Sequence, residues 1–108
     1  MKRGDVVLAA FSGDYGKPRP AVVVQTDLAN PTHASVVLCP LTSTLRDAPL
    51  FRLDVTPGPG TGLEKSSQIM VDKIGTLRRD RVGRVVGRLD DADLVRLNRS
   101  LAFWLGLA

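Results

Sequence analysis

The chain has 108 residues, of which 44% are hydrophobic and 24% are charged, and its formal net charge is +4. This length favours a single domain spanning residues 1–108, and the mixed composition is typical of a folded protein and not of a disordered one. The first apolar run, Val6 to Phe11, is too short for a membrane span of about 20 residues or for a signal peptide, and one cysteine excludes an internal disulfide. We therefore expect a cytoplasmic protein without a membrane segment.

The first half of the chain contains four short stretches typical of β-strands. These stretches are apolar or alternate in polarity, and turns rich in Gly, Pro, Asn and Asp separate them. The expected strands are residues 5–11, 20–26, 35–41 and 51–56. Because Pro40 has no backbone N–H, it suggests that the third strand lies at a sheet edge or ends at a bulge.

The second half continues with strands and ends with a helix. Residues 57–63, PGPGTGL, are expected to form a loop, a strand is expected at 67–74, and a short strand or a turn at 82–88. Residues 75–77 would extend or bend the first of these strands. From Asp90 onward, acidic residues suit a helix N-terminus, and apolar residues then recur at three- and four-residue spacing, at Leu94, Leu97, Leu101, Trp104 and Leu105. Many short strands followed by one helix favour a small barrel or a curled sheet.

The positive charge is concentrated in one segment. Six cations and one anion, Asp80, lie between Lys73 and Arg88, so this segment carries +5 and the rest of the chain sums to about −1. A local cationic segment suits a polyanionic partner such as nucleic acid or an acidic protein. Alternatively, these cations belong to a solvated surface strand and loop and bind no partner.

The residues available for chemistry exclude several classes of enzyme. The chain has one histidine, His33, and one cysteine, Cys39, so no cluster has the spacing of a zinc site, and Cys39 is expected to be a small buried residue. PGPGTGL lacks the Lys-Ser/Thr ending of a nucleotide-binding loop. No metal or cofactor is therefore expected. Arg, Thr, Ser, Lys and carboxylates suffice for RNA cleavage, because the 2′-hydroxyl can attack the neighbouring phosphate once that phosphate is bound and oriented.

An ordered set of motifs resembles one family. The motifs are RGDVV from Arg3, GKPRPAVVVQ from Gly16, PLTS from Pro40 and SQIMVDKIGTL from Ser67, with Arg81-Val82 beyond. Each motif alone is weak, but their order and spacing over nearly the whole chain resemble the MazF/PemK/Kid toxin endoribonucleases. The resemblance implies the toxin of a type II toxin–antitoxin system, an mRNA interferase. It also implies a mainly β fold with a C-terminal helix, specifically a small SH3-like curled β-barrel.

The same resemblance implies an activity, partners and site residues. It implies a homodimer held by a MazE-like antitoxin, and metal-independent cleavage of single-stranded RNA that leaves a 2′,3′-cyclic phosphate and a 5′-hydroxyl. Arg19 of the RPAVV motif and Thr42 of PLTS take the catalytic positions. Asp72 matches an acidic position used in the Kid branch, but Met70 replaces the catalytic arginine of that branch. The expected RNA-binding residues are Ser43, Gln25, Lys17, Asp72, Lys73, Arg78, Arg79 and Arg81.

Two other functions remain open at this point. A CcdB-like gyrase poison has a similar fold and no nuclease activity, and Phe103-Trp104 faintly resembles its aromatic C-terminal helix. A non-catalytic module that binds RNA or antitoxin is the third possibility. Arg19-Pro20-Ala21 and Leu41-Thr42-Ser43 favour the nuclease. For Gln25, a hydrogen-bonded turn is the alternative to RNA binding.

Overall fold

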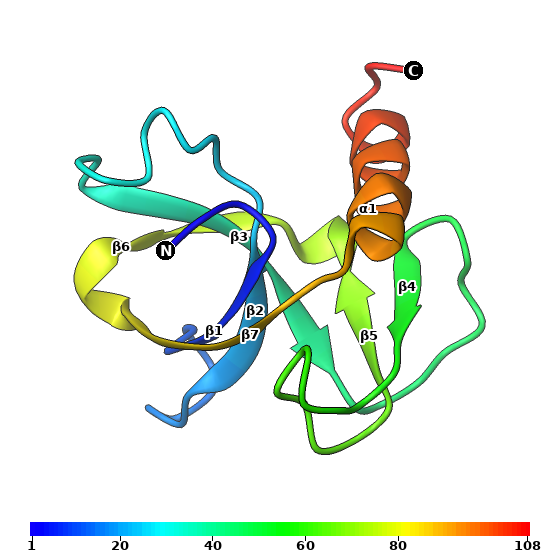
Figure 1. The fold of residues 1–108 in the computed structure, drawn as a ribbon, viewed down its shortest axis with the longest axis horizontal. Helices are drawn as coiled ribbons and strands as arrows, with labels where there is room; N and C mark the ends of the chain where they lie inside the picture. The colour runs from blue at the N-terminus through cyan, green and yellow to red at the C-terminus, as the bar shows by residue number, and fades with distance from the viewer.

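The computed structural model describes all residues from 1 to 108, and seven antiparallel strands form one curled sheet beside a single α-helix (Figure 1). The strand order is β4-β5-β3-β2-β1-β7, and β6 pairs with β3 off this path. The strands are β1 (Asp5–Ala9), β2 (Arg19–Val23), β3 (Ser35–Thr42), β4 (Arg52–Val55), β5 (Ser67–Met70), β6 (Gly75–Arg78) and β7 (Val82–Arg88), and the helix is α1 (Asp91–Trp104). The predicted mainly β fold with a C-terminal helix is confirmed. The sheet curls without closing, because β4 and β7 remain its two ends.

Strand β3 organises the sheet, because it changes partners along its length. Its first half pairs with β6 from Ser35 to Leu38, and its last residues, Leu41 and Thr42, pair with β5. The expectation that Pro40 marks an edge or a bulge is wrong, since Pro40 pairs with Ala21 inside the sheet. Pro40 falls between the residues that pair with β6 and those that pair with β5, so its missing N–H interrupts neither ladder.

The predicted strand 67–74 is divided for the same reason. Strand β5 ends at Met70, a 3₁₀ turn covers Val71–Lys73, and β6 begins at Gly75. The turn carries the chain from the half of β3 that pairs with β5 to the half that pairs with β6. The two parts of β3 that pair with β5 and β6 lie far from this segment in the sequence. Local periodicity therefore did not reveal the break.

Both faces of the central strands are buried. One cluster of 13 buried residues includes Val6, Val22 and Ile69 and lies against α1 through Leu97 and Leu101. The other cluster contains six buried residues on the opposite face of β1, β2 and β3, namely Val7, Ala9, Ala21, Val23, Val36 and Leu38. Figure 1 shows β6 and β7 curling around this second face, whereas α1, β4 and β5 lie on the other side. Burial of both faces explains the unbroken apolar runs of β1 and β2.

The PGPGTGL loop between β4 and β5 packs against β7, the strand at the other end of the sheet. A side chain at Gly62 would meet the backbone oxygen of Val86 at 2.2 Å, and one at Gly87 would meet the backbone of Thr61 at 2.2 Å. The amide of Arg88 donates to the Gly60 carbonyl at 2.9 Å. These glycines allow the loop between β4 and β5 to lie directly on β7.

Helix α1 has the predicted start and a partly exposed end. The Asp90 side chain accepts the Asp93 amide at 2.7 Å, an N-cap that satisfies a free amide. Leu97 and Leu101 are buried, whereas Trp104 is 43% exposed and packs on Phe51 with ring centroids 5.3 Å apart. The helix is neither long nor apolar enough to cross a bilayer.

Candidate active site

Arg19 and Thr42, the two expected catalytic residues, line one groove. Arg19 is the first residue of β2 and Thr42 is the last of β3. Ala21 pairs with Pro40, and continuing this register by two residues places Arg19 opposite Thr42. The groove has a volume of about 560 Å³, and its polar lining residues are Arg19, Thr42, Ser43, Thr44, Glu64, Lys65, Ser67 and Arg84.

A carboxylate outside the groove holds Arg19. The Nη2 atom of Arg19 donates to Oδ1 of Asp14 at 3.0 Å, and Nε lies 3.0 Å from Oδ2. The second contact is an ion pair without hydrogen-bond alignment, because Oδ2 has no hydrogen-bond donor. Asp14 belongs to the loop between β1 and β2, and Arg19 is itself flanked by Pro18 and Pro20, which restrict the backbone around it.

Thr42 also lines the groove. Its Oγ1 accepts the Thr44 amide at 3.1 Å, so the turn after β3 fixes the side chain. Ser43, between them, is exposed and also lines the groove. The loop that follows is held by Gln68, whose amide group donates to the Arg46 carbonyl at 2.9 Å and accepts the Arg46 amide at 3.0 Å. Gln68 is 5% exposed, so this attachment is buried.

Three charged groove residues were absent from the expected site. Arg84 lies in β7 and belongs to the cationic segment. Its charge was therefore counted from the sequence, but its place in the groove was not predicted. Glu64 and Lys65 come from the loop before β5, where no motif marks them. The docking of PGPGTGL on β7 places this loop beside Thr42, and that contact is not readable from local sequence.

Seven of the eight expected RNA-binding residues do not line the groove, and the side chains of three of these seven bond to other groups in the chain. The Gln25 side chain donates to the Ser35 carbonyl at 3.0 Å and accepts the Val37 amide at 3.2 Å, and it also donates to Asn30 in the loop after β2, as the turn alternative predicted. Arg79 donates to the carbonyls of His33 and Asn30. Arg78 is paired with Asp80, which raises the pKa of Arg78 and lowers that of Asp80. Asp72, in the turn after β5, is not a groove residue.

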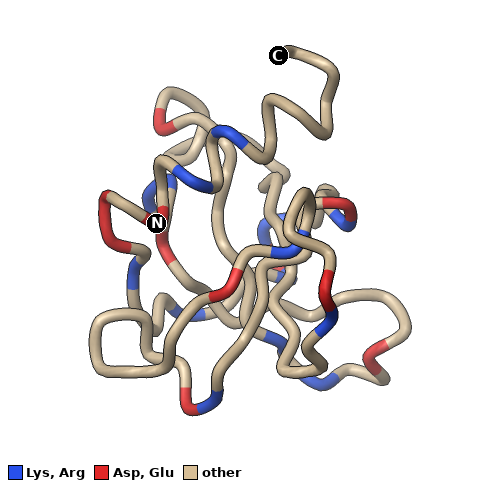
Figure 2. The backbone as a smooth tube through the Cα atoms, turned by 90° about the vertical axis from the view of Figure 1, so that its right-hand side faces the viewer, with Lys and Arg blue, Asp and Glu red and all other residues tan.

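The cationic segment is spread over the surface and partly neutralised. Lys17, Lys73 and Arg81 are exposed, and none of them lines the groove. Arg88 pairs with Asp5 at 3.1 Å. Figure 2 shows basic and acidic segments interspersed along the backbone, with no separation onto two sides. Within the segment, only Arg84 is therefore directed to the groove.

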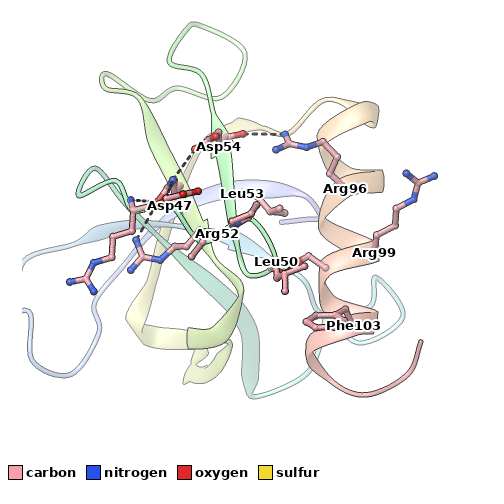
Figure 3. A pocket seen from close by; sticks show the side chains of 13 residues that line it. Asp47, Leu50, Arg52, Leu53, Asp54, Arg96, Arg99 and Phe103 are labelled. Carbon is pink, nitrogen blue, oxygen red and sulfur yellow. Dashed lines mark hydrogen bonds between the residues drawn. The ribbon is translucent and has the colours of Figure 1, made fainter.

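A second pocket, of about 440 Å³, lies between β4 and α1 and is less suited to be the reaction site (Figure 3). Four arginines line it, but Arg52 donates to the Thr44 carbonyl at 3.1 Å and Arg96 to the Asp54 carbonyl at 3.1 Å. In Figure 3, Arg96 reaches towards Asp54, whereas Arg99 points away from β4. These guanidinium groups hold the fold or diverge, so they do not converge on one ligand.

Comparison with known proteins identifies the family of the chain. The family model described as PemK-like, MazF-like toxin of type II toxin–antitoxin system matches residues 2–105. The chain belongs to this toxin family. A probable endoribonuclease MazF from Mycolicibacterium smegmatis is 45% identical to this toxin, over 100% of the chain and 99% of the relative. Endoribonuclease EndoA of Bacillus subtilis is 27% identical over 99% of the chain and 96% of the relative.

Solved structures resemble this toxin over nearly its whole length. A mycobacterial endoribonuclease in complex with its cognate antitoxin is 31% identical, with a TM-score of 0.80 over 100% of this chain and 97% of that one. The Mycobacterium tuberculosis toxin MazF-mt6 has a TM-score of 0.83 over 96% of this chain and 98% of that one, and at 21% identity it supports the fold alone. The predicted family and the endoribonuclease class are confirmed. The gyrase-poison alternative is not favoured.

Proposed function

We propose that this toxin cleaves single-stranded RNA in the groove that the ends of β2 and β3 share with β7 and the loop before β5, with Arg19 and Thr42 as its catalytic residues. The observation that carries the proposal is that Arg19 and Thr42 both line one groove. The guanidinium of Arg19 binds the non-bridging oxygens of the scissile phosphate through paired donors. Thr42 adds a hydrogen bond from its hydroxyl, whose oxygen already accepts the Thr44 amide.

The reaction that fits this groove is an internal transesterification. The 2′-oxygen forms a bond to phosphorus, the bond from phosphorus to the 5′-oxygen breaks, and a proton passes from the 2′-hydroxyl to the leaving oxygen. The products are a 2′,3′-cyclic phosphate and a 5′-hydroxyl, and no water is consumed. Binding and alignment of the phosphate supply most of the acceleration, because attacking and leaving groups belong to one molecule.

Arg84 and Lys65 extend the positive charge of the groove beyond Arg19. They suit the phosphates on either side of the cleaved bond, with Ser43 as a further hydrogen-bonding contact. Lys17, Lys73 and Arg81 are exposed and would act at longer range. RNA binding should therefore weaken as salt concentration rises.

The experiment combines pure toxin, a long single-stranded RNA and excess EDTA, followed by mapping of the cleaved ends. We expect cyclic-phosphate and 5′-hydroxyl ends in the presence of EDTA, and a loss of about 100-fold or more in rate for Arg19→Ala. Arg99→Ala is the matched control, because Arg99 lines the other pocket and should leave cleavage unchanged. A folded Arg19→Ala protein with the wild-type rate would contradict the proposal.

The same proposal includes the partner, the oligomeric state and the location of the toxin. An antitoxin resembling MazE covers the groove, and two copies of this single-domain chain form a homodimer in the cytoplasm. Exposed apolar residues at the end of α1, Phe103, Trp104, Leu105 and Leu107, support a covered surface. Sedimentation of the purified toxin should give a dimer mass, and a monomer at micromolar concentration would contradict this part.

A further inference from the structure

We infer that Asp14 is a positioning residue for this reaction: it fixes the Arg19 guanidinium from outside the groove so that the end of the fork is presented to the phosphate. The inference rests on the proposed function of Arg19. It adds the loop between β1 and β2 to the active site, although no motif marked Asp14.

The first observation is which edge of the guanidinium Asp14 occupies. Its two carboxylate oxygens face Nε and Nη2 of Arg19, both at 3.0 Å. A guanidinium has five N–H donors in a planar fork. The edge formed by Nε and Nη2 faces Asp14, which leaves both Nη1 hydrogens and the second Nη2 hydrogen. The second Nη2 hydrogen and one Nη1 hydrogen form the end of the fork, and this pair can bind two phosphate oxygens at once.

The second observation is the location of the carboxylate. Arg19 lines the groove, whereas Asp14 does not. A carboxylate bound to Arg19 inside the groove would compete with the phosphate for the guanidinium, and Glu64, which also lines the groove, forms no ion pair with Arg19. Asp14 instead contacts Arg19 without lining the groove, so a phosphate and this carboxylate can bind the guanidinium together.

The third observation is that the loop is built to bring Asp14 back to Arg19. Gly13 and Gly16 have φ of +90° and +79°, and Tyr15 has φ of 52°, so the backbone reverses tightly on both sides of Asp14. The Lys17 amide donates to the Asp14 carbonyl at 3.0 Å. As a result, the Asp14 side chain is only 18% exposed although it lies on a surface loop.

An arginine side chain has several freely rotating bonds, and ordering it on binding costs side-chain entropy. Asp14 orders the Arg19 side chain before RNA arrives. Removing the carboxylate should therefore slow the chemical step more than it weakens RNA binding, because a small misplacement of a catalytic group lowers the rate steeply.

The test measures kcat and KM with a short fluorogenic RNA that spans a cleavage site mapped for the wild-type toxin. For Asp14→Ala and the isosteric Asp14→Asn we expect kcat to fall about 10- to 100-fold while KM changes less than about 3-fold. Asp14→Glu, which keeps the carboxylate, should recover most of the rate. Asp93→Asn is the matched control, because it removes a carboxylate from an ion pair with Arg96 on α1, away from the groove.

A second measurement distinguishes positioning of Arg19 by Asp14 from competition between Asp14 and RNA for the Arg19 guanidinium. The same RNA with a 2′-O-methyl group at the cleaved nucleotide cannot react, and its Kd should be unchanged within about 3-fold in Asp14→Asn. Binding that becomes 10-fold tighter, or a kcat equal to the wild-type value in folded Asp14 variants, would overturn the inference. The proposed function stands on its own if wild type cleaves RNA and Arg19→Ala does not, even when the role of Asp14 is disproved. An inactive wild-type protein would instead disprove the proposed function.

Discussion

The Thr42 hydroxyl oxygen accepts the backbone amide of Thr44 at 3.1 Å. The oxygen is thereby fixed at the end of β3, and its own hydrogen remains free to be donated into the groove. A threonine at this position consequently offers one directed donor opposite Arg19, at the start of the neighbouring strand.

This geometry makes a direct prediction for Thr42. Thr42→Val keeps the shape but removes the donor, and we expect cleavage of RNA to slow by about 10²- to 10³-fold, as for other lost donors to a developing negative charge. Thr42→Ser retains the hydroxyl and should keep most of the activity. Circular dichroism and thermal melting of both proteins check that the fold is intact, and wild-type kinetics of Thr42→Val would refute the role.

The contact between the PGPGTGL loop and β7 predicts that adding a single methyl group at Gly87 lowers stability. Gly87→Ala would place a methyl group 2.2 Å from the Thr61 backbone, so the loop must shift or the strand must bend. We expect a loss of about 1–3 kcal/mol in the free energy of unfolding, measured in urea, together with slower cleavage because Lys65 moves. Gly60→Ala, which meets no atom within 4 Å, is the matched control. Equal stability of the two variants would contradict the close approach.

Gln68 should matter for both stability and activity. Its side chain binds the Arg46 backbone twice and also donates to Asp54 Oδ1 at 2.9 Å. We expect Gln68→Leu to lower the free energy of unfolding by about 1–3 kcal/mol and to slow RNA cleavage, because the loop after Thr42 loses its buried attachment. Asn30→Leu removes a buried amide away from the groove, so it should destabilise the fold and leave kcat near the wild-type value. A Gln68→Leu protein with normal kcat would show that the loop needs no such attachment.

Cys39 predicts how stability depends on alkaline pH. Burial raises the pKa of its thiol from 9.0 to about 12, so the folded chain keeps a proton that the unfolded chain releases. The thiol's stabilising contribution is full below pH 9 and declines towards pH 12, by at most about 1.4 kcal/mol per pH unit. Urea unfolding between pH 8 and pH 11 should therefore show a steeper loss for wild type than for Cys39→Ala. Parallel curves for the two proteins would contradict this assignment.

Local patterns were sufficient for the elements whose determinants are local. The helix beginning after Asp90 follows from an N-cap and a three-to-four-residue apolar repeat, and its observed range is Asp91–Trp104. Residues 82–88, expected to be a short strand or a turn, form strand β7 with the same bounds, and the apolar run of β2 was recognised within a few residues. The family, and with it Arg19 and Thr42 as site residues, came from the order of short motifs along the chain.

The tertiary structure decided everything that depends on partners distant in sequence. Strand β3 changes neighbours at Pro40, which divides the segment 67–74 and admits a proline inside the sheet. The pairing of β7 with β1 and the docking of PGPGTGL on β7 bring Arg84 and Lys65 into the groove, while the pairing of β6 with β3 commits Arg79 to backbone carbonyls. Charge and hydrophobicity are properties of single residues, so the sequence supplies them directly. The direction of a side chain depends on the strand beside it, and that is set only when the sheet has formed.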